Sequence, residues 1–248
     1  MTASARQRLR ALRGRPHNFL SRAQASEGHR LAFEVLDELH AGRRLPSFAE
    51  LEEVATNPHA RQGFLDWCQR TRRFALWTQE SVAALADHLR EGGFARIVEL
   101  GAGRGDLAWH LTRMGVPVEA TDAGAALYAT YTLPEYLALP ADVWENVRPL
   151  HYEAALASLQ PDCVLCAWMP PDQDWTPEIR AAASVREYVL FWELRGTTGG
   201  QSAFAVNPGW RPRDLIDVEE HLVGRTDDGL PHIGLTQYTR AAAFQRES

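Results

Sequence analysis

Lysine is missing from this sequence, and all 26 basic residues among its 248 are arginines. A phosphate-binding loop of the Walker type requires a lysine, so that class of nucleotide site is excluded. Schiff-base chemistry and catalysis by a lysine base are excluded for the same reason. The base candidates considered below are therefore carboxylates and one histidine.

Cysteine is scarce, and the three residues of this type are Cys68, Cys163 and Cys166. The last two form a C-x-x-C pair within the apolar run 163–167, where a buried cysteine usually acts as a small hydrophobic residue. A redox or metal role is the minor alternative, because no second Cys/His pair lies nearby. His221 and His232 lack a third ligand at a telling spacing, so no metal site is predicted.

Long apolar runs are also missing. No stretch has the roughly 20 apolar residues that a bilayer span requires. No signal-peptide core is visible either, so we expect a cytoplasmic protein without a membrane partner. The net charge of −6 and the pI of about 5.9 make nucleic acid an unlikely partner. The 45% share of hydrophobic residues is typical of a globular chain.

One stretch, Ile97–Leu111, has the pattern of a buried strand, a glycine-rich turn and a helix. Gly101, Gly103 and Gly105 form the turn, and glycine allows a ligand to lie against bare backbone. In open α/β sheets such a turn is where nucleotides bind. The dinucleotide fingerprint needs Gly or Ala at the next small position, which here is Asp106, so NAD is disfavoured.

The same stretch resembles motif I of the class I S-adenosylmethionine (SAM)-dependent methyltransferases, an acidic residue followed by x-G-x-G-x-G. Here Glu99 precedes Gly101, Gly103 and Gly105 without departure from the pattern. The family's next landmark is an acidic residue that holds the ribose hydroxyls after the second strand, and Asp122 matches it. The resemblance implies SAM as cofactor, with Ala123 beside the adenosine.

The resemblance also implies the fold class: an α/β, doubly wound Rossmann-like sheet of seven mostly parallel strands with an antiparallel C-terminal hairpin. We expect the hairpin strands at about 215–223 and 233–238. A helical N-terminal extension over residues 1–78 precedes the SAM-binding domain over residues 79–248. In the family such extensions lie over the cofactor, although these helices have a homodimer interface as an alternative role.

Further cofactor contacts follow from position in the family. After the third strand, Tyr152 or Glu153 matches the residue that approaches the adenine amino group, and Trp168 ends the strand that faces the methyl group. Amino-directed nucleic-acid methyltransferases have D/N/S-P-P-Y/F/W at this place. This chain has Met169-Pro170-Pro171-Asp172, with Met for the polar residue and Asp for the aromatic one, so a nucleic-acid acceptor is disfavoured.

Residues that contact the acceptor, and a general base, are predicted near the same strand ends. Four residues are candidates to line the acceptor pocket, with ordinary core packing as the alternative for the aromatic ones: Phe74, Trp77, Met169 and Trp175. A general base is needed only if the acceptor must lose a proton. Four residues are candidates for it, with solvated loop positions as the alternative: Asp172, Asp174, Glu193 and His151.

The N-terminal extension carries local signals of its own. Ser47-Phe48-Ala49-Glu50 fits a capping box at a helix start. Residues 1–25 are rich in arginine, which is compatible with a docking arm for an anionic partner. We favour the simpler interpretation of a solvated, partly frayed terminus.

Together these observations predict a SAM-dependent methyltransferase that transfers a methyl group to oxygen or nitrogen of a small-molecule acceptor. Two alternatives stay open. One is a SAM-binding protein that does not methylate, such as a regulatory subunit, because fold does not fix function. The other is a methyltransferase for protein or nucleic acid, with the arginine-rich segment as its docking element.

Overall fold

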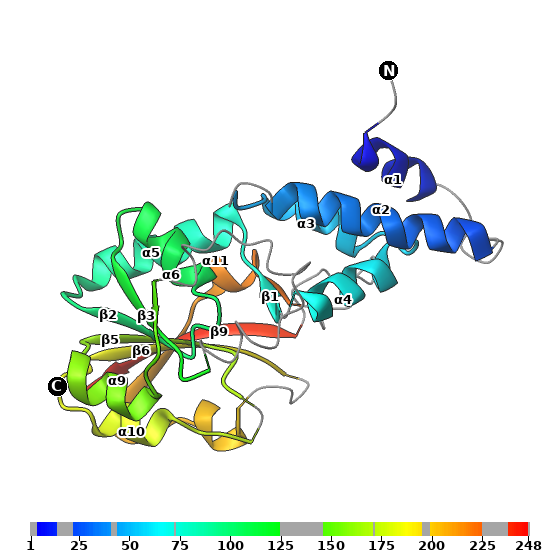
Figure 1. Cartoon of the computed structure of the whole chain (residues 1–248). Coiled ribbons are helices and arrows are strands. Elements are labelled where there is room, and N and C mark those ends of the chain that lie inside the picture. The colour runs from blue at the N-terminus through cyan, green and yellow to red at the C-terminus, as the bar shows by residue number, and fades with distance from the viewer. Residues whose placement is uncertain are drawn as a thin grey trace. The chain divides into compact units, whose positions relative to one another are not determined.

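A computed structural model describes residues 4–13, 22–40, 44–71, 73–124, 146–170, 172–194, 199–224 and 238–247. The chain divides into two compact units (Figure 1). The helical unit comprises Met1–Glu80 and His221–Tyr238, and the sheet unit comprises Ser81–Glu220 and Thr239–Ser248. The helical unit thus includes a late stretch that the two-part scheme from the sequence assigned to the second domain.

The described residues of the helical unit form four helices and one short strand pair. The helices are α1 (Ala5–Arg13), α2 (Arg22–His40), α3 (Phe48–Ala55) and α4 (Arg61–Arg70). Strand β1 (Ala75–Leu76) pairs antiparallel with β8 (Val223–Gly224). Leucine, valine and aromatic side chains at helical spacing form one continuous core, which includes Leu36, Leu51 and Phe64.

The capping box predicted at Ser47 is confirmed. The Ser47 side chain accepts a hydrogen bond from the backbone N–H of Glu50, and the Glu50 carboxylate accepts one from the N–H of Ser47. These contacts satisfy two N–H groups that would otherwise lack partners at the start of α3.

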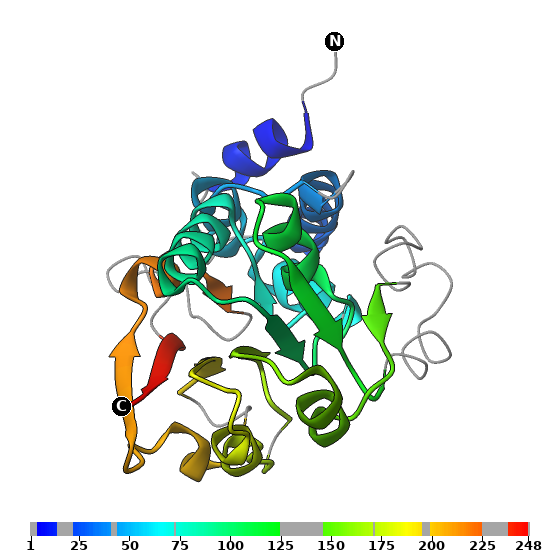
Figure 2. The same ribbon diagram turned by 90° about the vertical axis from the view of Figure 1, so that its left-hand side faces the viewer.

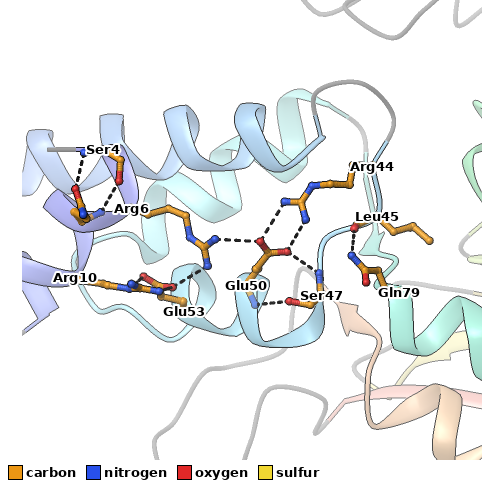
Figure 3. A network of polar contacts seen from close by, with 10 residues as sticks. Ser4, Arg6, Arg10, Arg44, Leu45, Ser47, Glu50, Glu53 and Gln79 are labelled. Atoms are coloured by element: carbon orange, nitrogen blue, oxygen red, sulfur yellow. Dashed lines mark hydrogen bonds and ion pairs between the residues drawn. The ribbon is translucent and has the colours of Figure 1, made fainter. Parts of the chain in front are cut away.

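The arginine-rich N-terminus differs from the frayed terminus that we favoured from the sequence. Residues 5–13 form helix α1, whose Leu9 and Leu12 are buried in the core of the helical unit. Arg6 pairs with Glu50 and Glu53, and Arg10 pairs with Glu53 (Figure 3). The acidic partners lie more than 40 positions along the chain, so local sequence gave no sign of them.

The sheet unit contains thirteen elements among the described residues, and their bounds are as follows. The helices are α5 (Gln79–Gly92), α6 (Asp106–Arg113), α9 (Tyr152–Leu159), α10 (Thr176–Ala181), α11 (Ile216–Glu219) and the 3-10 helix η4 (Gln201–Phe204). The strands are β2 (Ile97–Leu100), β3 (Val118–Thr121), β4 (Val147–Arg148), β5 (Cys163–Ala167), β6 (Glu187–Glu193), β7 (Trp210–Asp214) and β9 (Thr239–Arg246).

Seven strands form one sheet in the order β4-β3-β2-β5-β6-β9-β7. The first five are parallel, whereas β9 is antiparallel to both of its neighbours. Helices α5, α6 and α11 lie on one face, and α9 and α10 lie on the other (Figure 1, Figure 2). The prediction of a doubly wound, mostly parallel sheet of seven strands with an antiparallel C-terminal pair is confirmed.

The positions predicted for that C-terminal pair were wrong. The apolar residues around 215–223 include the helix α11, and the antiparallel strands are β7 and β9. Most of the other predicted strand, 233–238, lies outside the described residues. Two features hid the true strands: β7 is an exposed edge whose only buried residue is Trp210, and β9 is rich in alanine, a weak strand former.

The two cysteines of the C-x-x-C pair are buried in the central strand β5, as the apolar run predicted. Burial raises the pKa of both thiols, so they remain protonated near neutral pH. Among the described residues, no helix combines the length and the apolar character needed to cross a membrane.

Candidate functional site

The glycine turn joins the carboxyl end of β2 to helix α6. Its three glycines have φ angles of 67° (Gly101), 54° (Gly103) and 73° (Gly105), in the left-handed region that favours glycine. The turn is tied to the neighbouring strand, because the N–H of Ala102 donates to the carbonyl of Thr121 at 3.0 Å. The glycines are therefore required by the backbone path itself.

Asp122 directly follows β3 and lies against this turn. Its Oδ2 accepts a hydrogen bond from the N–H of Gly103 at 2.7 Å, and its Oδ1 accepts one from Gly124 at 2.6 Å. Burial raises the pKa of Asp122, and the two hydrogen bonds act in the opposite direction. A carboxylate offers about four acceptor positions, so two remain available to a ligand. The adjacent Ala123 is exposed in the same short loop.

Glu99 lies behind the turn, with only 2% of its surface exposed. Its Oε2 accepts a hydrogen bond from the N–H of Ala108 in the first turn of α6, at 3.1 Å. Burial raises the pKa of Glu99 to about 8, against the lowering effect of that hydrogen bond. At neutral pH the side chain is therefore mostly protonated, and in this structure it joins β2 to α6.

The start of α9 brings three of the predicted residues to the carboxyl end of the short strand β4. The ring of Tyr152 stacks on Trp175, with centroids 4.8 Å apart and planes 14° apart. His151 and Glu153 are exposed and lie 3.4 Å apart. Tyr152 thus joins this group to Trp175 of the loop after β5, and His151 contacts Tyr152 with ring centroids 4.5 Å apart.

The loop after β5 carries the largest group of predicted residues. Trp168 directly follows β5 with a φ of 55°, and Asp172 has a φ of 61°, which are unusual values for residues other than glycine. Such backbone strain concentrates at functional sites. Met169 is buried at 2% exposure, and the N–H of Trp175 lies 3.3 Å from its sulfur atom. Pro171 lies outside the described residues.

Asp174 has a structural task in this loop. Its Oδ1 accepts hydrogen bonds from the N–H of Thr176 at 2.9 Å and from the Thr176 hydroxyl at 2.6 Å. Burial raises its pKa, but hydrogen bonds from Thr176 and Ser202 outweigh that effect, so the pKa of Asp174 lies below its ordinary value. A carboxylate with these partners is a weak base.

The end of β6 places two residues on opposite faces of the sheet, because side chains alternate along a strand. Glu193 is buried at 3% exposure, whereas the half-buried Trp192 stacks on Phe204 with centroids 4.7 Å apart. Sequence reasoning named Glu193 and missed the Trp192–Phe204 pair. An aromatic residue next to the last position of a central strand was the available signal.

Phe74 and Trp77 flank β1 in the helical unit, whereas every other candidate residue belongs to the sheet unit. Phe74 is 39% exposed, and Trp77 is half-buried. The roles assigned to these two residues stay predictions, as do those of the catalytic candidates.

The sheet order and the glycine turn at its carboxyl edge define a Rossmann-like α/β fold. Comparison with solved structures matches this chain to methyltransferases at low similarity. The methyltransferase domain of bacterial CtHen1-C is 11% identical, with 68% of this chain and 98% of that chain covered and a TM-score of 0.42. No protein-family model and no curated protein sequence matches the chain.

Two further matches are enzymes with named substrates. Magnesium protoporphyrin IX methyltransferase from Synechocystis PCC 6803, solved with bound SAM, is 16% identical, with 68% and 79% of the two chains covered and a TM-score of 0.36. Mitomycin 7-O-methyltransferase MmcR is 15% identical, with 90% and 68% covered and a TM-score of 0.37.

Proposed function

We propose that this protein is a SAM-dependent methyltransferase that acts on oxygen or nitrogen of a small-molecule acceptor. One observation carries the proposal: the Asp122 carboxylate is hydrogen-bonded to Gly103 of a left-handed glycine turn, at the carboxyl edge of a parallel sheet. Nucleotide ligands bind at this edge in open α/β folds. The remaining acceptor positions of Asp122 suit a pair of ribose hydroxyls.

The other residues have the following proposed tasks. Glu99 holds the turn against α6, and the bare backbone of Gly103 faces the cofactor. Tyr152 borders the adenine, with Ala123 and Glu153 beside it. Trp168 and Met169 stand at the end of β5, where the family places the methyl group.

When bound, SAM supplies an electrophilic methyl group on a positively charged sulfur. The protein must then hold the acceptor in line with that group and exclude water, and such alignment accounts for much of the rate. Trp168, Trp192 and Phe204 offer apolar ring surface for this purpose at the ends of β5 and β6. Transfer to an acceptor oxygen or nitrogen would release SAH, and any proton on that atom would pass to a base of the protein or to water.

A base is required only for acceptors that must lose that proton. The hydrogen bonds of Asp174 make it the weakest of the four candidates. Asp172, Glu193 and His151 remain, and Glu193 is the buried one among them.

A docking role for the N-terminal segment has less support. Within the described residues, Arg6, Arg8 and Arg10 of α1 already form ion pairs with glutamates of the same unit. Charges that are neutralised in this way contribute little to binding of phosphates. We therefore keep the small-molecule acceptor and set the macromolecular one aside.

The first experiment is calorimetric titration of the whole protein with SAM and with S-adenosylhomocysteine (SAH). We expect micromolar binding that Asp122→Ala abolishes. Glu119→Ala is the matched control, because Glu119 lies on β3, the strand that Asp122 follows, and is exposed in a surface ion pair with Arg148. Equal binding by wild type and Asp122→Ala, or no binding by either, would overturn the proposal.

A second measurement separates methyl transfer from simple cofactor binding. Purified protein is incubated with SAM and a panel of phenols, carboxylic acids and amines, and formation of SAH is followed. Turnover with at least one acceptor supports an enzyme. Tight binding of SAM with no SAH formed across the panel points to the non-methylating alternative.

A further inference from the structure

The side chain of Trp175 lies on the glycine turn, although the sequence placed it on the acceptor side. A β-carbon added at Gly101 would come within 2.9 Å of two atoms of the Trp175 six-membered ring, Cη2 and Cζ3. At Gly103, in contrast, a β-carbon would have no atom of the described residues within 4 Å. The indole therefore covers the bare face of the first glycine of the turn and leaves that of Gly103 open.

Three contacts hold Trp175 there. It stacks on Tyr152, its Nε1–H donates to the side-chain oxygen of Gln173 at 2.8 Å, and its backbone N–H approaches the sulfur of Met169. Gln173 is in turn anchored through its carbonyl, which accepts a hydrogen bond from Gly200 at 2.7 Å. The indole is half-buried and packs at the margin of the sheet core, so its departure from the turn would uncover both Gly101 and the ring of Tyr152.

A ligand that lies against Gly101 needs the space that the indole takes. The ring is in van der Waals contact with this glycine, so no layer of ligand atoms fits between the two. Tyr152, the proposed neighbour of the adenine, is covered by the same ring. One side chain therefore covers two parts of the proposed cofactor site.

We propose that Trp175 gates this site: its indole swings away from Gly101 and Tyr152 when the adenosyl cofactor binds. This inference rests on the proposed function and adds a residue that sets cofactor affinity. Opening the gate costs the Trp175–Tyr152 stack and one exposed hydrogen bond. An aromatic pair of this kind corresponds to roughly a 2- to 12-fold change in an equilibrium constant.

The test compares the affinity of SAH for wild type, Trp175→Ala and Trp175→Phe by calorimetry. We expect Trp175→Ala to bind about 2- to 12-fold more tightly, because no ring has to be displaced. Trp175→Phe keeps a ring that stacks on Tyr152 and is expected to stay near wild type. Trp210→Phe is the control for loss of an indole, since Trp210 lies on the edge strand β7 beside Tyr188.

A second readout follows the ring itself. In protein labelled with 5-fluorotryptophan, the ¹⁹F resonance missing from Trp175→Phe identifies Trp175. Saturating SAH should shift that resonance and leave the one assigned to Trp210 in place. This shift of the Trp175 resonance tests the gate even if Trp175→Ala folds poorly and its affinity cannot be measured.

The outcomes separate the two proposals. If wild type binds SAH but Trp175→Ala binds equally or more weakly and the resonance stays in place, the gate is wrong and the cofactor site stands. SAH binding by Trp175→Ala that is about 2- to 12-fold tighter than by wild type, together with a shifted Trp175 resonance, supports the gate. Absence of binding in every variant overturns both the gate and the methyltransferase proposal.

Discussion

Asp122 lies between the glycine turn and its own loop, with its two carboxylate oxygens 2.7 Å from the nitrogen of Gly103 and 2.6 Å from that of Gly124. One side chain thus fixes two backbone segments, and it is only 8% exposed. In Asp122→Asn one of these N–H groups would face an amide NH₂ group, which donates and does not accept. We expect the free energy of unfolding to fall by about 1–3 kcal/mol, the cost of a buried unsatisfied donor.

Urea denaturation of the whole protein measures this change. Glu119→Gln is the control, because its ion pair with Arg148 is exposed and such pairs contribute about 1 kcal/mol or less. If Asp122→Asn is as stable as Glu119→Gln, the two hydrogen bonds do not hold the turn.

Glu99 makes the free energy of unfolding depend on pH, and the direction of that dependence follows from its pKa. Burial raises the pKa of Glu99 from its ordinary value of 4.5 to about 8, so between these pH values the folded state keeps a proton that the unfolded state releases. Stability contributed by this group is therefore full below about pH 4.5 and decreases as pH rises toward 8. Glu99→Gln keeps an acceptor for the Ala108 N–H and removes the titration.

We expect Glu99→Gln to gain stability relative to wild type as pH rises from 5 to 8, by up to about 1.4 kcal/mol per pH unit. The free energy of unfolding of both proteins, measured by urea denaturation at several pH values, checks this. A difference that stays constant across the range would mean that Glu99 is ionised in the folded protein.

The features that local sequence determines were predictable. The three glycines of the turn impose positive φ angles, and Ser47 and Glu50 are three positions apart, so short-range chemistry sufficed for both. The position of Trp175 on Gly101 was not predictable, because it joins residues far apart in the chain. Strand β9 was missed for a similar reason: its alanines become strand residues through burial between β6 and β7, not through their own propensity.

Glu50 is expected to stabilise the helical unit above acid pH. Burial raises its pKa, but Arg44, the N–H of Ser47 and Arg6 outweigh that effect and lower the pKa to about 2 (Figure 3). The stabilisation is therefore present above about pH 4.5 and is lost as pH falls toward 2. Glu50→Gln, which keeps the capping acceptor, should be less stable than wild type at pH 6.

Thermal unfolding at pH 6 and at pH 2.5, followed by circular dichroism, tests this expectation. The difference in melting temperature between wild type and Glu50→Gln should be smaller at the lower pH. Glu52→Gln on the exposed side of α3 is the matched control and should show no gap at either pH. A gap of equal size at both pH values would assign the effect to geometry and not to charge.

Gly63 sets the distance between α2 and α4 in the helical unit. A β-carbon at this position would lie 2.6 Å from the carbonyl oxygen of His29 and 2.8 Å from the Cβ of Ala32, so the two helices would have to separate. Alanine favours a helix over glycine by about 1 kcal/mol, yet overpacking of a tight contact costs about 1–3 kcal/mol. We therefore expect Gly63→Ala to unfold at a lower urea concentration than wild type, whereas Gln62→Ala, at an exposed position of the same helix, should stay within about 0.5 kcal/mol of it. If Gly63→Ala were instead more stable than wild type, helix propensity would dominate, and the close approach of α2 and α4 at this glycine would be refuted.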